Sequence, residues 1–188
     1  MRFVDRVDAG RQLADKLVEL RGTPNVVVLG IPRGGVVVAY EVALRLGAPF
    51  DVALSRKLGA PDNEELAIGA LAENGSRILD ESIISHLRVP SDYIERVTAQ
   101  QLGEIARRGA VYRGSRKALD TCGKVVVVVD DGVATGATML VTLHALREHG
   151  AQSLIAAAPV MSRRVNGDNT IGDLEVRELL ADLAETRS

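Results

Sequence analysis

The feature that most constrains the fold is an unbroken run of five valines, Val125 to Val129, which leads directly into two aspartates and a loop bounded by glycines. A strand that is apolar on both faces is typical of a parallel sheet that helices cover on both sides. Further short apolar segments lie at 26–30, 50–55 and 152–160, with helical patterns between them. The sequence therefore predicts an α/β fold with a mainly parallel, twisted sheet flanked by helices.

Helices are predicted at 8–20, 36–47, 137–150 and 173–185, and residues 81–117 are expected to form a largely helical insertion. The stretch at 56–65, "RKLGAPDNEE", is polar and rich in turn-forming residues, which predicts a mobile loop. Residues 66–75 and 76–80 are expected to pair as a hairpin through Asn74 and Gly75.

Composition bounds the class of protein. The 188 residues are expected to form one domain, 1–188. With 23 basic and 25 acidic residues the net charge is −2, and only 3% of residues are aromatic, which argues against nucleic-acid binding. A single cysteine, Cys122, excludes an internal disulfide framework. No apolar stretch approaches the roughly 20 residues that span a bilayer, and the first residues do not resemble a secretory signal. We expect a cytoplasmic protein without a membrane partner.

The loop after the valine run has the features of a phosphate site. Ligands of parallel sheets bind beyond the carboxyl ends of the strands, and a helix N-terminus directs free N–H groups at an anion. Gly132 and Gly136 allow close backbone approach, while Thr135 and Thr138 add hydroxyl donors. Asp130 and Asp131 would repel a phosphate but can accept hydrogen bonds from sugar hydroxyls nearby, so the pattern describes a ribose 5-phosphate.

Two alternatives fit less well. An ATP-type P-loop needs a lysine where Ala137 stands. A receiver-type acid pair needs a phosphorylated aspartate and a lysine on later strands, and too little sheet follows Asp131.

The segment "VVVVVDDGVATGAT" resembles the phosphoribosyl pyrophosphate (PRPP) signature of type I phosphoribosyltransferases, especially the adenine-type form. "GIPRGGVVVA" resembles their pyrophosphate-binding loop, and "SRKLGAPDNEELAIGA" their basic strand end and flexible loop. The resemblance covers roughly residues 1–160 and extends to a bacterial phosphoribosyltransferase-like family. It implies a magnesium-dependent glycosyltransferase of nucleotide metabolism that transfers the phosphoribosyl group of PRPP to an unidentified acceptor and releases diphosphate. A nucleobase is one class of acceptor.

The resemblance assigns roles to residues of this chain. Asp130, Asp131, Arg33 and Lys57 form the expected catalytic set, in which the two aspartates hold the ribose hydroxyls and the two cations meet the diphosphate. Mg²⁺ would be held mainly by substrate oxygens, with Asp130 and Asp131 nearby. The expected substrate-binding residues are Gly34, Gly35, Arg56, Gly132, Val133, Ala134, Thr135, Gly136, Ala137 and Thr138.

The acid–base residue is left open. Adenine-type enzymes carry a catalytic glutamate on the mobile loop, for which Glu64 and Glu65 are the candidates. The hypoxanthine–guanine type has an aspartate where Ala134 stands, and this chain lacks it. The family also continues past the last predicted strand with more sheet, so a shortened C-terminal region is expected.

The alternative function is a PRPP- or nucleotide-sensing module without catalysis. The missing aspartate at position 134 and the shortened C-terminal region favour it. The residues of the predicted mobile loop disfavour it, because a sensor does not need a loop that closes over the site. A partial apolar stripe at 91–112 leaves a homodimer open.

Overall fold

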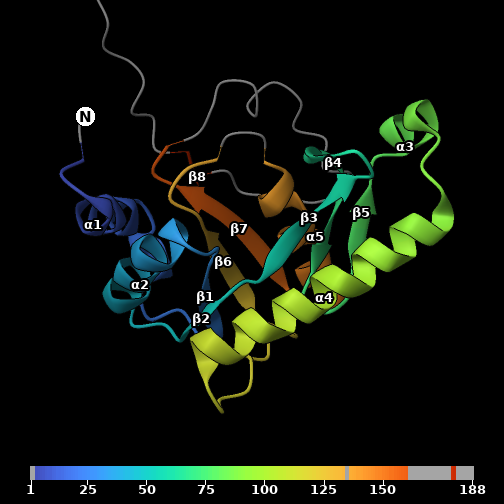
Figure 1. The fold of residues 1–188 in the computed structure, drawn as a ribbon. Helices are drawn as coiled ribbons and strands as arrows, with labels where there is room; N and C mark the ends of the chain where they lie inside the picture. Colours follow the sequence, from blue (N-terminus) through green and yellow to red (C-terminus); the bar gives the residue numbers. More distant parts are fainter. Residues whose placement is uncertain (1–2, 134–135, 161–178, 181–188) are drawn as a thin grey trace, which may run out of the picture.

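The computed structural model describes residues 3–133, 136–160 and 179–180, which form two sheets with helices around them (Figure 1). The larger sheet has five parallel strands in the order β2 (Phe50–Val52), β1 (Val26–Gly30), β6 (Val125–Val129), β7 (Ser153–Ala158) and β8 (Leu179–Leu180). The smaller sheet is antiparallel, in the order β3 (Ser55–Ala60), β4 (Asn63–Ala72) and β5 (Arg77–Leu79).

The valine strand lies at the centre of the larger sheet. β6 is hydrogen-bonded to β1 on one side and to β7 on the other, and Val126 to Val129 are fully buried. Side chains on both of its faces enter apolar clusters, because Val127 and Val129 pack in one cluster and Val126 and Val128 in another. The predicted α/β class with a mainly parallel sheet is therefore confirmed.

The two clusters correspond to the two faces of this sheet. Figure 1 shows the helices that cover each face. On one face lie α1 (Arg6–Lys16), the short 3₁₀ turn η1 (Val18–Leu20) and α2 (Gly34–Leu46). α2 forms despite its valines because Val38, Val42 and Leu46 recur at helical spacing on its buried face, and Gly47 ends it with a φ of +68°. On the other face lies α5 (Ala137–Glu148), followed by the smaller sheet.

The prediction of a mobile loop at 56–65 is wrong in its secondary structure. These residues form most of the β3–β4 hairpin, in which Arg56 pairs with Leu71 and Lys57 with Ala70. The hairpin is stable in spite of its polar sequence because alternate side chains reach an apolar cluster, where Leu58 and Ile68 are fully buried. The predicted second hairpin is confirmed, since β4 pairs with β5.

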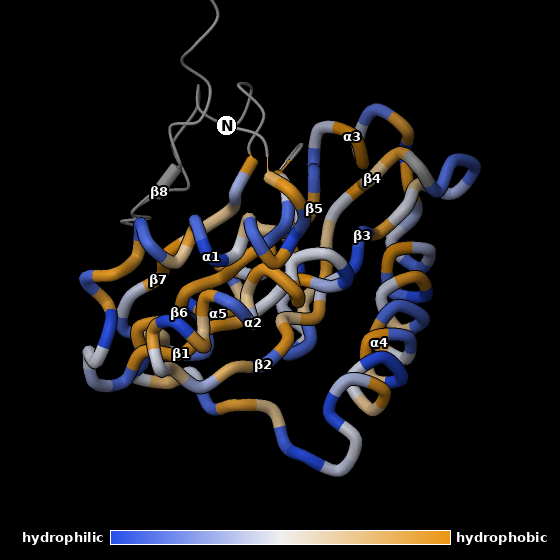
Figure 2. Tube along the Cα trace, turned by 90° about the vertical axis from the view of Figure 1, so that its left-hand side faces the viewer, coloured by the Kyte–Doolittle hydropathy of each residue, from blue (hydrophilic) through white to orange (hydrophobic). Residues whose placement is uncertain are grey.

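The predicted helical insertion consists of α3 (Glu81–Leu87) and the 23-residue α4 (Ser91–Arg113). α4 crosses the smaller sheet and buries Ile94, Thr98 and Ile105 against it. Figure 2 shows the resulting alternation of apolar and polar residues along α4, in contrast with the continuously apolar β6.

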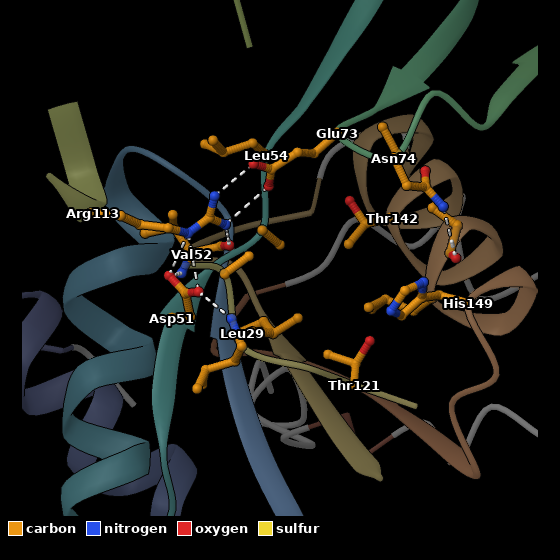
Figure 3. Close-up of a pocket in the computed structure, with 16 residues that line it drawn as sticks. Leu29, Asp51, Val52, Leu54, Glu73, Asn74, Arg113, Thr121, Thr142 and His149 are labelled. Atoms are coloured by element: carbon orange, nitrogen blue, oxygen red, sulfur yellow. Dashed lines mark hydrogen bonds and ion pairs between the residues drawn. The ribbon is translucent and has the colours of Figure 1, made fainter. Parts of the chain in front are cut away.

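A buried ion network fixes the end of α4 to both sheets (Figure 3). The Nε atom of Arg113 donates to both carboxylate oxygens of Asp51 at 2.9 and 3.0 Å, and its two terminal nitrogens donate to Glu73. Asp51 also accepts a hydrogen bond from the Leu119 N–H at 2.9 Å. The side chains of Arg113 and Asp51 are each only 8% exposed, so the network joins β2, the end of β4 and α4 inside the protein.

The C-terminal prediction is largely outside the described residues. Within the helix predicted at 173–185, the structure describes only Leu179–Leu180, and these form strand β8 rather than helix. In the described part of the chain, no helix combines the length and the apolar composition that crossing a membrane requires.

Candidate active site

The two motifs singled out in the sequence follow neighbouring parallel strands. β1 and β6 are in register along their whole length, from Val26 opposite Val125 to Gly30 opposite Val129. The pairing continues one step further, because the Ile31 N–H donates to the Val129 carbonyl at 2.8 Å. The segments 31–35 and 130–133 therefore leave the same edge of the sheet, where ligands of such sheets bind.

Glycines let these two segments touch. A Cβ atom on Gly34 would overlap Oδ2 of Asp131, and a Cβ on Gly35 would lie 2.8 Å from the Cα of Asp130. Neither position has room for a side chain, so Gly34 and Gly35 are required for the loop to pack against the aspartates. The structure thus brings together four residues that the sequence assigned to two different parts of the substrate.

Arg6, which the sequence analysis did not single out, joins this cluster. It is the first residue of α1, and its Nε donates to Oδ2 of Asp131 at 2.8 Å. The side chains are 60% and 31% exposed, so the ion pair is open to solvent and to a ligand. No local pattern could have indicated this contact, because the two residues are 125 positions apart in the chain.

Burial raises the pKa of Asp130 to about 6. The Asp131 N–H donates to Oδ1 of Asp130 at 2.8 Å and opposes the rise, whereas the neighbouring Asp131 carboxylate adds to it. A carboxylate whose pKa is raised by burial is stabilised when a hydroxyl donor or a cation binds it, because either one favours the ionised form. The pKa of Asp130 is therefore raised above that of an exposed aspartate, mainly because the carboxyl group is partly buried.

Asp130 should make stability fall with rising pH. Its pKa is 3.8 in its ordinary state and about 6 in the folded protein, so between these values the native state binds more protons than the unfolded chain. The free energy of unfolding therefore decreases as pH rises through this window. We expect Asp130→Asn to gain stability relative to the wild type between pH 4 and pH 6, measured by urea unfolding at several pH values. A difference between the two proteins that does not change with pH would contradict the raised pKa.

The residues predicted to form the phosphate cradle lie at the beginning of α5, in the part that the structure describes. Gly136 precedes the helix with a φ of +80°, a conformation that favours glycine, and the exposed Thr138 lies in its first turn. Val133 is buried, and its N–H donates to the Val160 carbonyl at 3.0 Å. Gly132 connects it to the aspartates, and the backbone of Ala137 begins the helix. Ala134 and Thr135 lie outside the described residues.

Arg33 lies at the start of α2, directly before Gly34, and is exposed. Its side chain is thus at the same edge of the sheet as the aspartates. By contrast, the Nε of Arg56 donates to Oε1 of Gln101 on α4 at 2.8 Å.

Arg56, Lys57 and Glu64 line a separate polar pocket of about 270 Å³ between the β3–β4 hairpin and α4. The backbone of Glu65 continues β4, and its side chain is outside the described structure. The structure therefore places the predicted residues in two groups, one at the edge of the larger sheet and one on the hairpin.

A further cavity is distinct from both groups of predicted residues. This cavity of about 250 Å³ lies between α5, the end of β4 and the segment after α4, and Thr121, Thr142 and His149 surround it (Figure 3). Its lining is mostly apolar and includes none of the predicted site residues. It is therefore not the predicted ribose 5-phosphate site.

The chain is similar to known proteins along most of its length. The family model of the phosphoribosyl transferase domain matches residues 4–183. A provisionally named phosphoribosyl transferase of Mycobacterium tuberculosis (strain H37Rv) is 46% identical over 158 residues, which are 84% of this chain and 35% of that protein. The chain thus spans about a third of the length of the curated relatives that it matches.

Solved structures show the same relationship. The crystal structure of TT1426 from Thermus thermophilus is 44% identical and superimposes with a TM-score of 0.74, covering 88% of this chain and 80% of that one. A hypoxanthine-guanine phosphoribosyltransferase from Bacillus anthracis is 12% identical with a TM-score of 0.50, over 90% of this chain and 76% of that one, and shows the shared fold alone.

The chain belongs to the phosphoribosyl transferase domain family. Its resemblance to the type I phosphoribosyltransferases is thereby confirmed.

Proposed function

We propose that this domain transfers the phosphoribosyl group of PRPP to an acceptor and releases diphosphate. The observation that carries the proposal is the direct packing of Gly34 and Gly35 against Asp131 and Asp130. PRPP carries a diphosphate on C1, next to the ribose hydroxyls. A loop for diphosphate that touches a pair of ribose-binding carboxylates matches that order of groups.

In the proposed reaction the bond between C1 and the diphosphate oxygen breaks, and diphosphate leaves with the bonding electron pair. A lone pair on the acceptor forms the new bond to C1, and the acceptor loses its proton to solvent or to a base that is not yet assigned. Asp130 and Asp131 accept hydrogen bonds from the 2- and 3-hydroxyls and stabilise the positive charge that develops at C1. The start of α5 binds the 5-phosphate.

The carboxylates of Asp130 and Asp131 also suit Mg²⁺, which usually takes one or two protein carboxylates and keeps its other ligands from substrate and water. The raised pKa of Asp130 indicates a carboxylate that a cation would stabilise. Among the described residues no cluster of three or more metal-binding side chains occurs. When bound, Mg²⁺ would neutralise charge on the diphosphate.

The activity is tested by incubating the protein with PRPP, Mg²⁺ and a panel of nucleobases and measuring the diphosphate released. Release that depends on one base would establish the transfer and identify the acceptor. Saturable PRPP binding without diphosphate release for any base would favour the sensing module. Absence of PRPP binding would overturn the proposal.

Arg33 should hold the diphosphate end of PRPP. Arg33→Ala should weaken the binding of PRPP and diphosphate, and leave that of ribose 5-phosphate close to wild type, because the residue follows β1 whereas the phosphate cradle follows β6. A hydrogen bond to a charged group contributes about 1.5–3 kcal/mol, so a loss of roughly ten- to hundredfold is expected in titration calorimetry. Arg45→Ala, near the other end of α2, is the control. Equal losses for all three ligands would show that Arg33 shapes the whole pocket.

A further inference from the structure

We propose that Arg6 binds the diphosphate group of the substrate while it holds Asp131, so that a single guanidinium spans the two halves of the site. This inference rests on the proposed function and adds to it a residue from the N-terminal helix, far in sequence from both motifs. It concerns which side chains stabilise the leaving group.

The position of the guanidinium is the first argument. Its Nε donates to Oδ2 of Asp131 at 2.8 Å, and the same nitrogen lies 2.7 Å from the point where Gly34 would carry a Cβ. The side chain of Arg6 is therefore in contact with the carboxylate of Asp131 and lies against the glycine loop at the same time. A diphosphate bound along that loop would lie next to it.

The unused donors are the second argument. An arginine has five N–H donors in a rigid fork, and only the Nε–H of Arg6 is engaged here. Among the residues that the structure describes, none accepts a hydrogen bond from its terminal nitrogens, and the side chain is 60% exposed. Two parallel N–H groups are the geometry with which arginine binds phosphate oxygens.

The third argument is that Arg6 is held in place before any ligand arrives. Asp5 caps α1 by accepting a hydrogen bond from the Asp8 N–H at 2.8 Å. Gly10 lets α1 approach α2 closely, since a Cβ there would lie 2.8 Å from the carbonyl oxygen of Val38. α2 itself begins at Gly34. Arg6 and the glycine loop are thus fixed to the same pair of helices, and little ordering is needed on binding.

Charge is the fourth argument. A diphosphate beside Asp130 and Asp131 is repelled by their two negative charges. Cations close to the diphosphate and to the carboxylates are needed to offset this repulsion. Arg33 is exposed at this edge of the sheet, whereas Arg56, one of the expected substrate-binding residues, is bonded to Gln101 in the pocket on the hairpin. Arg6 supplies a positive charge between the carboxylate of Asp131 and the loop. Arg6 thus supplies, beside Arg33, a cationic contact for the diphosphate.

The test compares Arg6→Ala with Arg11→Ala by titration calorimetry, with magnesium diphosphate and ribose 5-phosphate as the probes. Arg11 is a matched control, because it lies on the same helix, is 63% exposed and donates through its Nε to Glu41 at 3.0 Å. We expect Arg6→Ala to weaken diphosphate binding roughly ten- to hundredfold, more than it weakens ribose 5-phosphate binding, and Arg11→Ala to leave both unchanged.

The same comparison in an Asp131→Asn background separates direct binding from positioning. If Arg6 touches the diphosphate, removing it still costs about tenfold in diphosphate affinity when Asp131 is no longer charged. If Arg6 acts only by holding Asp131, the second substitution has no further effect, and the inference is overturned. Arg6→Lys should recover less than half of the lost binding energy, because an ammonium lacks the fork that serves both partners.

Failure of the inference can be told from failure of the proposed function. A wild-type protein that binds diphosphate and ribose 5-phosphate, together with an Arg6→Ala variant that matches Arg11→Ala, would remove the role of Arg6 and leave the function standing. A wild-type protein that binds neither probe would remove both. Equal melting temperatures of the two variants would show that a loss of binding does not come from a loss of fold.

Discussion

Replacing both Asp130 and Asp131 with asparagine is expected to weaken PRPP binding by at least about 100-fold and to remove turnover. Each carboxylate is proposed to accept a hydrogen bond from a ribose hydroxyl, and a hydrogen bond to a charged group contributes about 1.5–3 kcal/mol, so two lost interactions correspond to roughly 10²- to 10⁴-fold. Asparagine has nearly the same shape as aspartate, and the substitution at 130 also removes a partly buried charge. The folded state should therefore persist, which circular dichroism and thermal melting would check.

The exposed acid Asp92, in the first turn of α4, provides the control, and Asp92→Asn should bind PRPP like the wild type. Ribose 5-phosphate should lose affinity in the double variant together with PRPP, because it carries the same hydroxyls. Unchanged affinity for both ligands in a folded double variant would show that the aspartates do not bind ribose.

Replacing Arg113 with alanine is expected to lower the free energy of unfolding by about 3–5 kcal/mol, the range that is typical when one partner of a buried ion pair is removed. The arginine is 8% exposed and neutralises Asp51, which is equally buried, while it also binds Glu73 and the Val52 carbonyl (Figure 3). Without it, the described residues would leave the buried Asp51 with the N–H groups of Val52 and Leu119 as hydrogen-bond donors and with no cation beside it. Urea unfolding would measure the loss.

Arg107 offers a control on the same helix. It pairs with Glu104 on the surface, where its side chain is 66% exposed, so Arg107→Ala should leave the unfolding midpoint nearly unchanged. If Arg113→Ala does not fold, Arg113→Lys keeps the charge and still tests the network, because lysine cannot bind Asp51 and Glu73 through one planar group. Midpoints that match for the variants at 113 and 107 would mean that the network contributes no more than a surface ion pair.

The sequence predicted those parts of the fold that depend on local pattern. β1 and β6 are apolar on both faces, which only a covered parallel sheet accommodates, and α2 ends where Gly47 permits a left-handed turn. The hairpin of β3 and β4 was missed because its residues are polar and form turns readily. Its stability comes from distant partners, chiefly the packing of Leu58 beneath α4, and no pattern within 56–65 contains that information.

The candidate site divides in the same way. The aspartates and the glycine loop could be found from residues that are adjacent in the chain, and the structure places them in contact. Sequence patterns could not predict the contact of Arg6 with Asp131 or that of Arg56 with Gln101. Each contact depends on how a helix from another part of the chain packs. Local motifs thus indicated the aspartates and the glycine loop, whereas tertiary packing determines which arginine side chains lie beside them.

The register of β1 with β6 has a consequence for how the protein folds. These central strands are separated by roughly 100 residues, and pairing across so long a loop carries an entropic cost that slows folding. The β3–β4 hairpin, which lies between them in the chain, pairs residues that are close in sequence, so its pairing can begin earlier. The glycine loop and the aspartates meet only when β1 and β6 pair. Ligand binding should therefore appear late in refolding, together with the last and slowest step, and a bound ligand should stabilise the central sheet as a whole.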